Sequence, residues 1–136
     1  MKIVLDTNCL INVIMPNSYN NDIWQAFRQR KYSICVSNEI LFEYHEILSK
    51  HYNAIIANTL IKELLESPNV EKVSPAFRFN LITADPDDNK FVDCAITVGA
   101  TYIVSNDKHF DELKNYDFPK VDVRQLSEFL QIVRTM

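Results

Sequence analysis

The chain has 136 residues, of which 47% are hydrophobic and 24% charged, and this composition predicts a single folded domain over residues 1–136 rather than a disordered chain. The formal net charge of −4 counts against a strongly basic nucleic-acid-binding protein, although a metal ion bound among carboxylates would change the local electrostatics. No stretch is long and apolar enough to span a membrane, so no contact with a membrane is expected.

Short apolar runs alternate with helical patterns along the chain. Continuous apolar runs, typical of strands buried on both faces, occupy residues 3–5, 32–36 and 101–104, with weaker candidates at 70–73 and 121–123. Helical periodicity covers residues 21–30, 38–50, 54–66, 88–98 and 123–133. This alternation predicts the α/β class, as a three-layer α/β/α fold with a central parallel sheet of about five strands.

The glycine and cysteine content narrows the classes of protein further. Gly99 is the only glycine, so no glycine-rich loop exists to bind a phosphate, and Rossmann and P-loop nucleotide binding are excluded. Gly99 itself is expected to end the helix over 88–98 in a left-handed conformation. The cysteines, Cys9, Cys35 and Cys94, have no metal-binding spacing, so buried free thiols and a reducing, cytoplasmic location are expected.

Two aspartates follow predicted strands directly. Asp6 comes after the strand over 3–5, and Asp107 follows the strand that ends at Val104. In open parallel sheets ligands bind beyond the carboxyl ends of the strands, so these two acids are expected in the same crevice. A carboxylate that ends a buried strand is also costly to remove from water without a partner.

Glu43 is the acid of the helix over 38–50 that is best placed to reach inward. At about 100° per residue it borders the apolar arc of this helix, whereas Glu39 and Glu46 point further towards solvent. Ser37 is expected to cap the start of the same helix. Taken alone, Glu43 would more often be a solvated charge at the edge of a helix face.

The stretch from Asp85 to Asp93 begins another helix. Asp88 is in register with Phe91 and with later apolar residues of this helix, which predicts that it lies on the buried stripe. Asp93 is predicted to project away from that stripe, so it ranks below Asp88. Asp85 or Asp87 is the expected cap, although a lone Asp88 would also cap a helix more often than bind a metal.

Four carboxylates gathered at one sheet edge would repel each other and raise each other's pKa. A hard divalent cation such as Mg²⁺ or Mn²⁺ relieves this repulsion, and in such a site it activates water for attack on a phosphodiester. Zinc is disfavoured because the cysteines and histidines lack ligand spacing, and solvated or packing roles are expected for His45, His51 and His109. The predicted reaction is hydrolysis without a covalent enzyme intermediate.

Four motifs, in order, resemble those of PIN domains. They are Ile3–Asn8, Ser37–Tyr44, Asp88–Ala95 running on to Gly99 and Ala100, and Ile103–Asp107, and the tail over 123–130 is similar to the usual closing strand and helix. The resemblance spans nearly the whole chain. The Asp-Pro-Asp-Asp stretch at 85–88 looks most like the branch of toxins of toxin–antitoxin pairs related to VapC-type toxins.

The resemblance implies a PIN-like parallel sheet, a Mg²⁺ or Mn²⁺ cofactor and endoribonuclease activity on an RNA substrate. The resemblance assigns metal-binding and catalytic roles to Asp6, Glu43, Asp88 and Asp107. Supporting roles, in orienting the acids or a water molecule, carry over onto Thr7, Asn8, Ser105 and Asp93.

The resemblance also bears on a fifth metal ligand and on the partners of the chain. His109 stands where some relatives have another acid, which puts a fifth ligand in doubt. The subgroup implies a cognate antitoxin protein, and family analogy implies a homodimer. Lys90 and Lys108, close to Asp88 and Asp107, are candidates for RNA contacts, although single surface charges are more often only solvated.

Two other classes of protein also have an aspartate after the opening strand, but they fit this sequence poorly. A dehalogenase-like phosphatase needs an acid where this chain has Asn8, and a signalling receiver domain needs an acidic pair near the same strand. Two alternatives stay open at this stage. One is a non-catalytic PIN-fold interaction module, and the other is a nuclease that acts on DNA.

Overall fold

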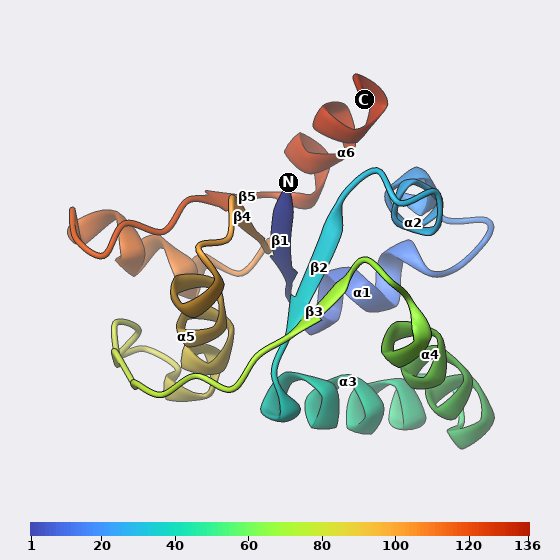
Figure 1. The fold of residues 1–136 in the computed structure, drawn as a ribbon, viewed down its shortest axis with the longest axis horizontal. Coiled ribbons are helices and arrows are strands. Elements are labelled where there is room, and N and C mark those ends of the chain that lie inside the picture. The colour runs from blue at the N-terminus through green and yellow to red at the C-terminus, as the bar shows by residue number, and fades with distance from the viewer.

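A computed structural model describes residues 1–136 as a five-stranded parallel sheet covered by helices (Figure 1). The strand order is β3-β2-β1-β4-β5, and all four neighbouring pairs are parallel. The strands are β1 (Lys2–Leu5), β2 (Ser33–Val36), β3 (Val70–Lys72), β4 (Tyr102–Val104) and β5 (Val123–Arg124). The predicted α/β class and the five-stranded parallel sheet are therefore confirmed.

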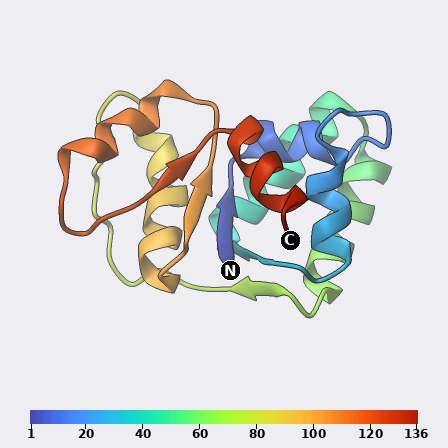
Figure 2. The ribbon, with the colours of Figure 1, turned by 90° about the horizontal axis from the view of Figure 1, so that it is seen from above.

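Six α-helices and two 3-10 helices connect the strands, with helices on both sides of the sheet (Figure 2). The α-helices are α1 (Thr7–Val13), α2 (Asn21–Arg28), α3 (Asn38–His51), α4 (Ala54–Glu66), α5 (Asn89–Val98) and α6 (Leu126–Arg134). The 3-10 helices are η1 (Pro86–Asp88) and η2 (Lys108–Asn115). No helix combines the length and the apolar content that crossing a membrane requires.

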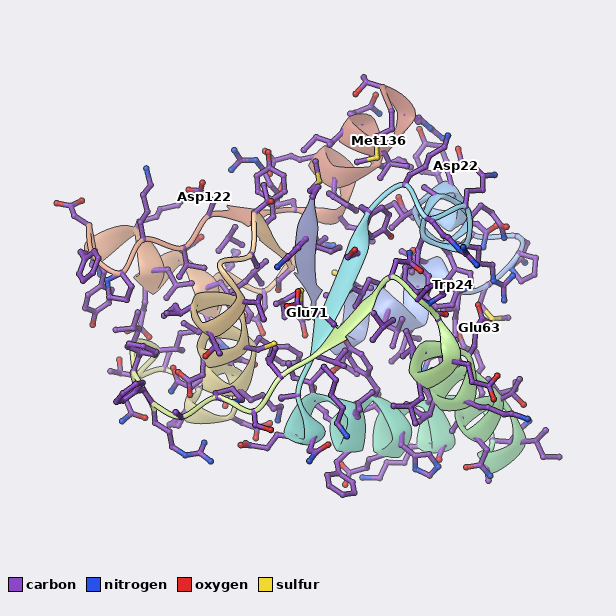
Figure 3. All side chains as sticks on the ribbon, viewed as in Figure 1. Asp22, Trp24, Glu63, Glu71, Asp122 and Met136 are labelled. Carbon is purple, nitrogen blue, oxygen red and sulfur yellow. The ribbon has the colours of Figure 1, made fainter.

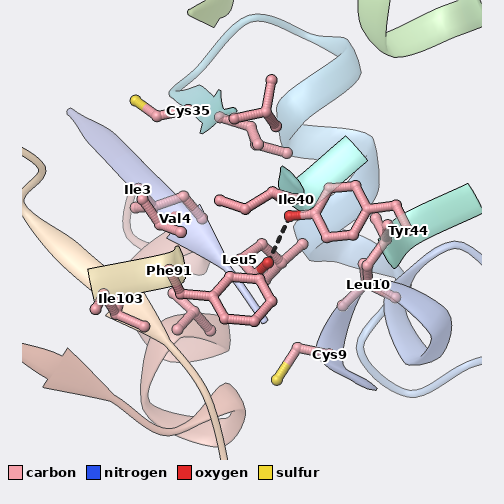
Figure 4. Packing of buried hydrophobic residues seen from close by; sticks show 14 of the residues in the cluster. Ile3, Val4, Leu5, Cys9, Leu10, Cys35, Ile40, Tyr44, Phe91 and Ile103 are labelled. Atoms are coloured by element: carbon pink, nitrogen blue, oxygen red, sulfur yellow. Dashed lines mark hydrogen bonds between the residues drawn. The ribbon is translucent and has the colours of Figure 1, made fainter. Parts of the chain in front are cut away.

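The central strands are buried on both faces, as their continuous apolar sequences predict. Ile3, Val4 and Leu5 of β1 are fully buried, and helices on both sides keep them from water. Figure 4 shows these strand residues packed against α3, where the hydroxyl of Tyr44 donates a hydrogen bond to the carbonyl oxygen of Leu5. This bond fixes α3 against the end of β1, and so it places Glu43 beside Asp6.

The ends of the helices follow the local sequence signals. The hydroxyl of Ser37 caps α3 by accepting a hydrogen bond from the backbone N–H of Ile40. Gly99 ends α5 with a φ of 64°, the left-handed region that favours glycine. The three cysteines are free and buried, as expected.

The aromatic residues of α2 pack inside the molecule. Trp24 lies between α2 and α4 in Figure 3, and its ring stacks on that of Phe27 with 4.9 Å between the centroids. Tyr19, which precedes the helix, is exposed. Trp24 and Phe27 therefore have packing roles, and Tyr19 does not lie in the core.

Several predicted elements were wrong in their bounds, and one was missed. Helix α1 was not predicted, and only its N-cap residue, Asp6, separates it from β1. The tail pattern over 123–133 is divided between β5 and α6, which begins at Leu126. Helix α5 begins at Asn89, one residue later than predicted.

The predicted buried stripe of α5 is confirmed at Phe91, Val92 and Ala95, but the predicted exposure of Asp93 was wrong. Asp93 is 3% exposed, whereas Asp88 stands before the helix in η1 and is only partly buried. The prediction assumed one buried stripe, but α5 contacts β1, β2, β4 and α3, so more than one of its faces is covered. A helix enclosed in this way buries residues that a one-sided pattern assigns to solvent.

Candidate metal centre

The acidic residues meet at the carboxyl ends of β1 and β4. These two strands are neighbours in the sheet, and Leu5 pairs with Val104. Asp6 follows the first strand, and its backbone N–H donates a hydrogen bond of 3.0 Å to the carbonyl oxygen of Val104. The chain leaves β4 through Ser105 and Asn106 to Asp107, so both strands deliver an aspartate to the same edge.

Asp6 is buried at the centre of this edge, with 7% of its surface exposed. The hydroxyl of Ser105 donates to Asp6 Oδ2 at 2.7 Å, and the structure contains no salt bridge to Asp6. Burial raises the pKa of Asp6, and the neighbouring charges of Glu43 and Asp107 raise that pKa further. The structure therefore holds an acid whose ionised form is costly unless a cation binds beside it.

Ser105 links the two strand-end aspartates. Its hydroxyl oxygen accepts a hydrogen bond of 3.0 Å from the backbone N–H of Asp107 while it donates to Asp6. Asp107 in turn caps η2, because its Oδ1 accepts the backbone N–H of His109 at 2.9 Å. The buried serine thus fixes the direction of Asp6 and the path of the chain into η2.

Glu43 reaches the same edge from α3 and has a partner on each oxygen. The buried hydroxyl of Thr7 donates to Oε2, and the Nζ of Lys90 lies 2.8 Å from Oε1. Lys90 also lies 2.9 Å from Asp87 Oδ1. Lys90, a predicted candidate for RNA contact, is therefore paired with two carboxylates of the chain itself.

Asp88, Asp85 and His109 form the tightest group of ligand atoms. One atom from each lies within 4.8 Å of the others, and His109 Nδ1 is 3.2 Å from Asp88 Oδ2 and 3.8 Å from Asp85 Oδ2. Burial raises the pKa of Asp88 to about 6, helped by the charges of Asp85, Asp107 and Asp6. The hydrogen bond to Asp88 raises the pKa of His109 above its ordinary value.

His109 joins this group to Asp107, whose Oδ1 lies 3.2 Å from the same ring nitrogen. A solvated or packing role was predicted for His109, and only a capping role for Asp85. Asp85 does cap η1, by accepting the backbone N–H of Asp87 at 3.2 Å. Neither residue carried a helical or strand-end signal, because both lie in the loops that flank the site.

A hollow of about 250 Å³ opens beside Asp6 and Asp107. Three asparagine side chains line it, Asn8, Asn12 and Asn106. The Oδ1 of Asn106 accepts the backbone N–H of Leu126 at 2.8 Å, which ties this wall to the start of α6. Asn8 was predicted from its motif, whereas Asn12 and Asn106 were not singled out.

Two further predicted residues lie outside the acidic group. The Oδ1 of Asp93 accepts the backbone N–H of Phe79 at 3.1 Å and so holds the segment that precedes η1. Lys108 is exposed at the start of η2 and has no ion-pair partner in the structure. Asp93 thus anchors a loop, and Lys108 remains a surface charge near Asp107.

The donor set at this edge fits a hard divalent cation. Carboxylate oxygens dominate, with one imidazole and no thiol, and Mg²⁺ and Mn²⁺ prefer such ligands. The charges also fit, since neighbouring carboxylates help to raise the pKa of both Asp6 and Asp88. The arrangement can hold a cation at the mouth of a polar hollow.

Comparison with known proteins agrees with this architecture. A family model described as "PIN domain" matches residues 2–109. No curated protein sequence matches the chain. Two solved structures are similar in fold. VapBC2 from Rickettsia felis, bound to a DNA fragment from their promoter, has a TM-score of 0.62 and 18% identity, over 92% of this chain and 98% of that one. DNA-bound VapBC from Salmonella typhimurium has a TM-score of 0.59 and 18% identity, over 93% and 98%.

Proposed function

The chain belongs to the PIN-domain family, and from this premise we propose that it is a metal-dependent endoribonuclease that hydrolyses RNA phosphodiester bonds. PIN domains are nuclease domains, so phosphodiester hydrolysis is the class of reaction to expect. The observation that carries the proposal is Asp6, a buried carboxylate without a cationic partner that lies near the charges of Glu43 and Asp107. A divalent ion is the partner that this group lacks.

In the proposed site, Asp6, Glu43, Asp88 and Asp107 hold Mg²⁺ or Mn²⁺. When bound, the divalent ion supplies an activated water and neutralises charge that develops on the phosphate. The surrounding residues orient the acids: Ser105 holds Asp6, and Thr7 holds Glu43. Asn8 lines the hollow beside Asp6, where its amide is placed to bind a polar group of the substrate.

We propose further that the chain is the toxin of a toxin–antitoxin pair, with a cognate antitoxin protein and a second copy of itself as partners. The fold similarity to two VapBC complexes supports this role. Large apolar side chains also remain exposed on α3 and α4, with Phe42 and Ile55 each 77% exposed, as expected of a protein-binding surface. A monomer in light scattering at working concentration would count against the homodimer.

The test is cleavage of a panel of structured and unstructured RNAs and single-stranded DNA in Mg²⁺, Mn²⁺ or EDTA. Wild type is expected to cut RNA only with metal, and Asp6→Asn is expected to lose at least about a hundredfold in rate, the scale of removing one essential charge-stabilising group. Asp117→Asn, an exposed aspartate away from the site, is the matched control and should cut like wild type.

Each alternative function predicts a different result in the same assay. Faster cleavage of single-stranded DNA than of any RNA would replace the proposed substrate with DNA. If wild type cuts nothing, or if Asp6→Asn and the EDTA samples cut equally well, the catalytic proposal fails. The chain would then be better described as a PIN-fold interaction module.

A further inference from the structure

Lys90 differs from every other paired lysine or arginine in the molecule. Its side chain is 10% exposed, whereas the other lysine and arginine side chains in ion pairs are between 38% and 81% exposed. It lies 2.8 Å from Glu43 Oε1 and 2.9 Å from Asp87 Oδ1, and its Nζ is 5.8 Å from the ring centre of Phe91. A largely buried lysine side chain held by two carboxylates is a built feature rather than a solvated surface charge.

The contacts of Lys90 divide the acidic residues into two groups. Glu43 and Asp87 share the ammonium of Lys90, and the other oxygen of Glu43 accepts the hydroxyl of Thr7. Asp6, Asp88 and Asp107 have no lysine or arginine partner, and the basic side chain beside them is that of His109, which contacts Asp88 and Asp107. One group of acids therefore already shares a cation supplied by the protein, and the other has no such cation.

We propose that the ammonium of Lys90 stands in the place of a second divalent ion, so that the chain binds a single metal ion at Asp6, Asp88 and Asp107. Glu43 then acts through Lys90, as the carboxylate that holds this internal cation at the edge of the metal site. An ammonium and a divalent ion cannot occupy the same side of one carboxylate, because like charges a few ångströms apart repel strongly. The inference rests on the metal site of the proposed function, and it removes Glu43 from the direct ligands of that ion.

The position of Lys90 supports a fixed role of this kind. It is the second residue of α5, and it follows Asn89, whose buried amide donates to and accepts from the backbone of Ile82 at 2.9 Å in each bond. Helix α5 also packs on three strands of the sheet. The ammonium is thus carried by a rigid element, and its carboxylate partners come from α3 and η1.

The test counts metal ions and needs no RNA. Calorimetric titration of the whole chain with MnCl₂ is expected to give one site per chain for wild type and for Lys90→Arg, which keeps the charge. Lys90→Met removes the internal cation, and it is expected to bind a second Mn²⁺, which doubles the stoichiometry. Lys50→Met removes an exposed charge from α3 and should keep one site.

The outcomes separate this inference from the proposed function. Two ions bound by wild type, or one ion bound by a folded Lys90→Met, would overturn the role of Lys90 even if the chain cuts RNA. One ion bound by wild type and two by Lys90→Met would support it even if no RNA is cut. If circular dichroism shows that Lys90→Met does not fold, Lys90→Met with Asp87→Asn relieves the excess charge and is titrated instead. In that pair Glu43 still offers the vacated position, so a second ion is expected, and a single ion overturns the inference.

Discussion

Asp6 and Lys90 are both charged side chains removed from water, and they differ in what surrounds them. Lys90 is held by two carboxylates, so the attraction to its partners compensates for its lost hydration. Asp6 has no cationic partner, and burial raises its pKa, helped by the nearby charges of Glu43 and Asp107. An acid whose ionised form is costly in the folded chain marks a position where a ligand is expected.

Asp88 gives a pH dependence that can be measured without metal. Its pKa rises from 3.8 to about 6 in the folded chain, so folded protein holds this proton between those two values while unfolded protein has released it. The free energy of unfolding of metal-free protein should therefore fall as pH rises from about 4 to about 6. Because the side chain is not fully buried, solvent screening reduces the effect, and a loss of about 1–2 kcal/mol is expected.

The measurement is urea denaturation in EDTA at pH 4.5, 5.5 and 7. Asp88→Asn has no proton to lose, so its stability relative to wild type should increase across this range. His109 contacts the same oxygen and titrates nearby, so His109→Gln is measured in parallel to separate its contribution. A constant difference between Asp88→Asn and wild type at all three pH values would mean that Asp88 has an ordinary pKa.

At the scale of elements, the segment between β3 and η1 is held mainly by hydrogen bonds to side chains rather than by the backbone hydrogen bonds of a strand or helix. Asp93 accepts the backbone N–H of Phe79, Asn89 binds Ile82 in both directions, and Glu112 accepts the backbone N–H groups of Thr83 and Ala84. These contacts deliver the chain to Asp85 and Asp88. The geometry of the acidic group therefore depends on polar residues of α5 and η2.

Asp93→Ala tests this anchoring role. Loss of the acceptor leaves the N–H of Phe79 unpaired, so the free energy of unfolding should fall by about 1–3 kcal/mol. Limited proteolysis should cut the variant faster between residues 74 and 84. Asp93→Asn retains an oxygen at the same position and should restore most of the protection.

Metal titration of the same variants separates anchoring from ligation. Metal stoichiometry should stay unchanged in Asp93→Ala, because Asp93 lies with Phe79 rather than among the ligand atoms. Loss of the ion in both Asp93→Ala and Asp93→Asn, with normal proteolytic protection, would instead make Asp93 part of the metal site.

The elements also show how much of the fold could be predicted from the sequence. Apolar runs predicted the buried strands because a strand covered on both faces needs no polar positions, and this holds for Ile3–Leu5. Helical periodicity identified the buried stripe of α5 but could not predict the burial of Asp93, since periodicity identifies one buried face and this helix has several. Helix α1 was missed because it is short and only one residue, Asp6, separates it from the strand.

At the scale of the whole molecule, the strand order explains why distant acids meet. β1 lies between β2 and β4, so the residues that follow these strands reach one edge although they are far apart in the chain. A parallel sheet with strand ends at one edge made the meeting of Asp6 and Asp107 predictable. The pairing of Lys90 with Glu43 was not predictable, because side-chain contacts between α5 and α3 depend on how both helices pack.

Because Asp6, Asp88 and Asp107 come from three separate parts of the chain, a divalent ion that binds them should stabilise the fold as a whole. An ion that binds only folded protein adds about 2.7 kcal/mol at a concentration one hundred times its Kd, which raises the Tm of a domain of this size by roughly 10 °C. Thermal unfolding followed by circular dichroism, in EDTA and in MnCl₂, measures this shift. Asp6→Asn should gain less from Mn²⁺, yet it should unfold at a higher temperature than wild type in EDTA, because it removes a buried charge from among other acids. An equal Mn²⁺ shift in wild type and Asp6→Asn would place the stabilising ion elsewhere on the molecule.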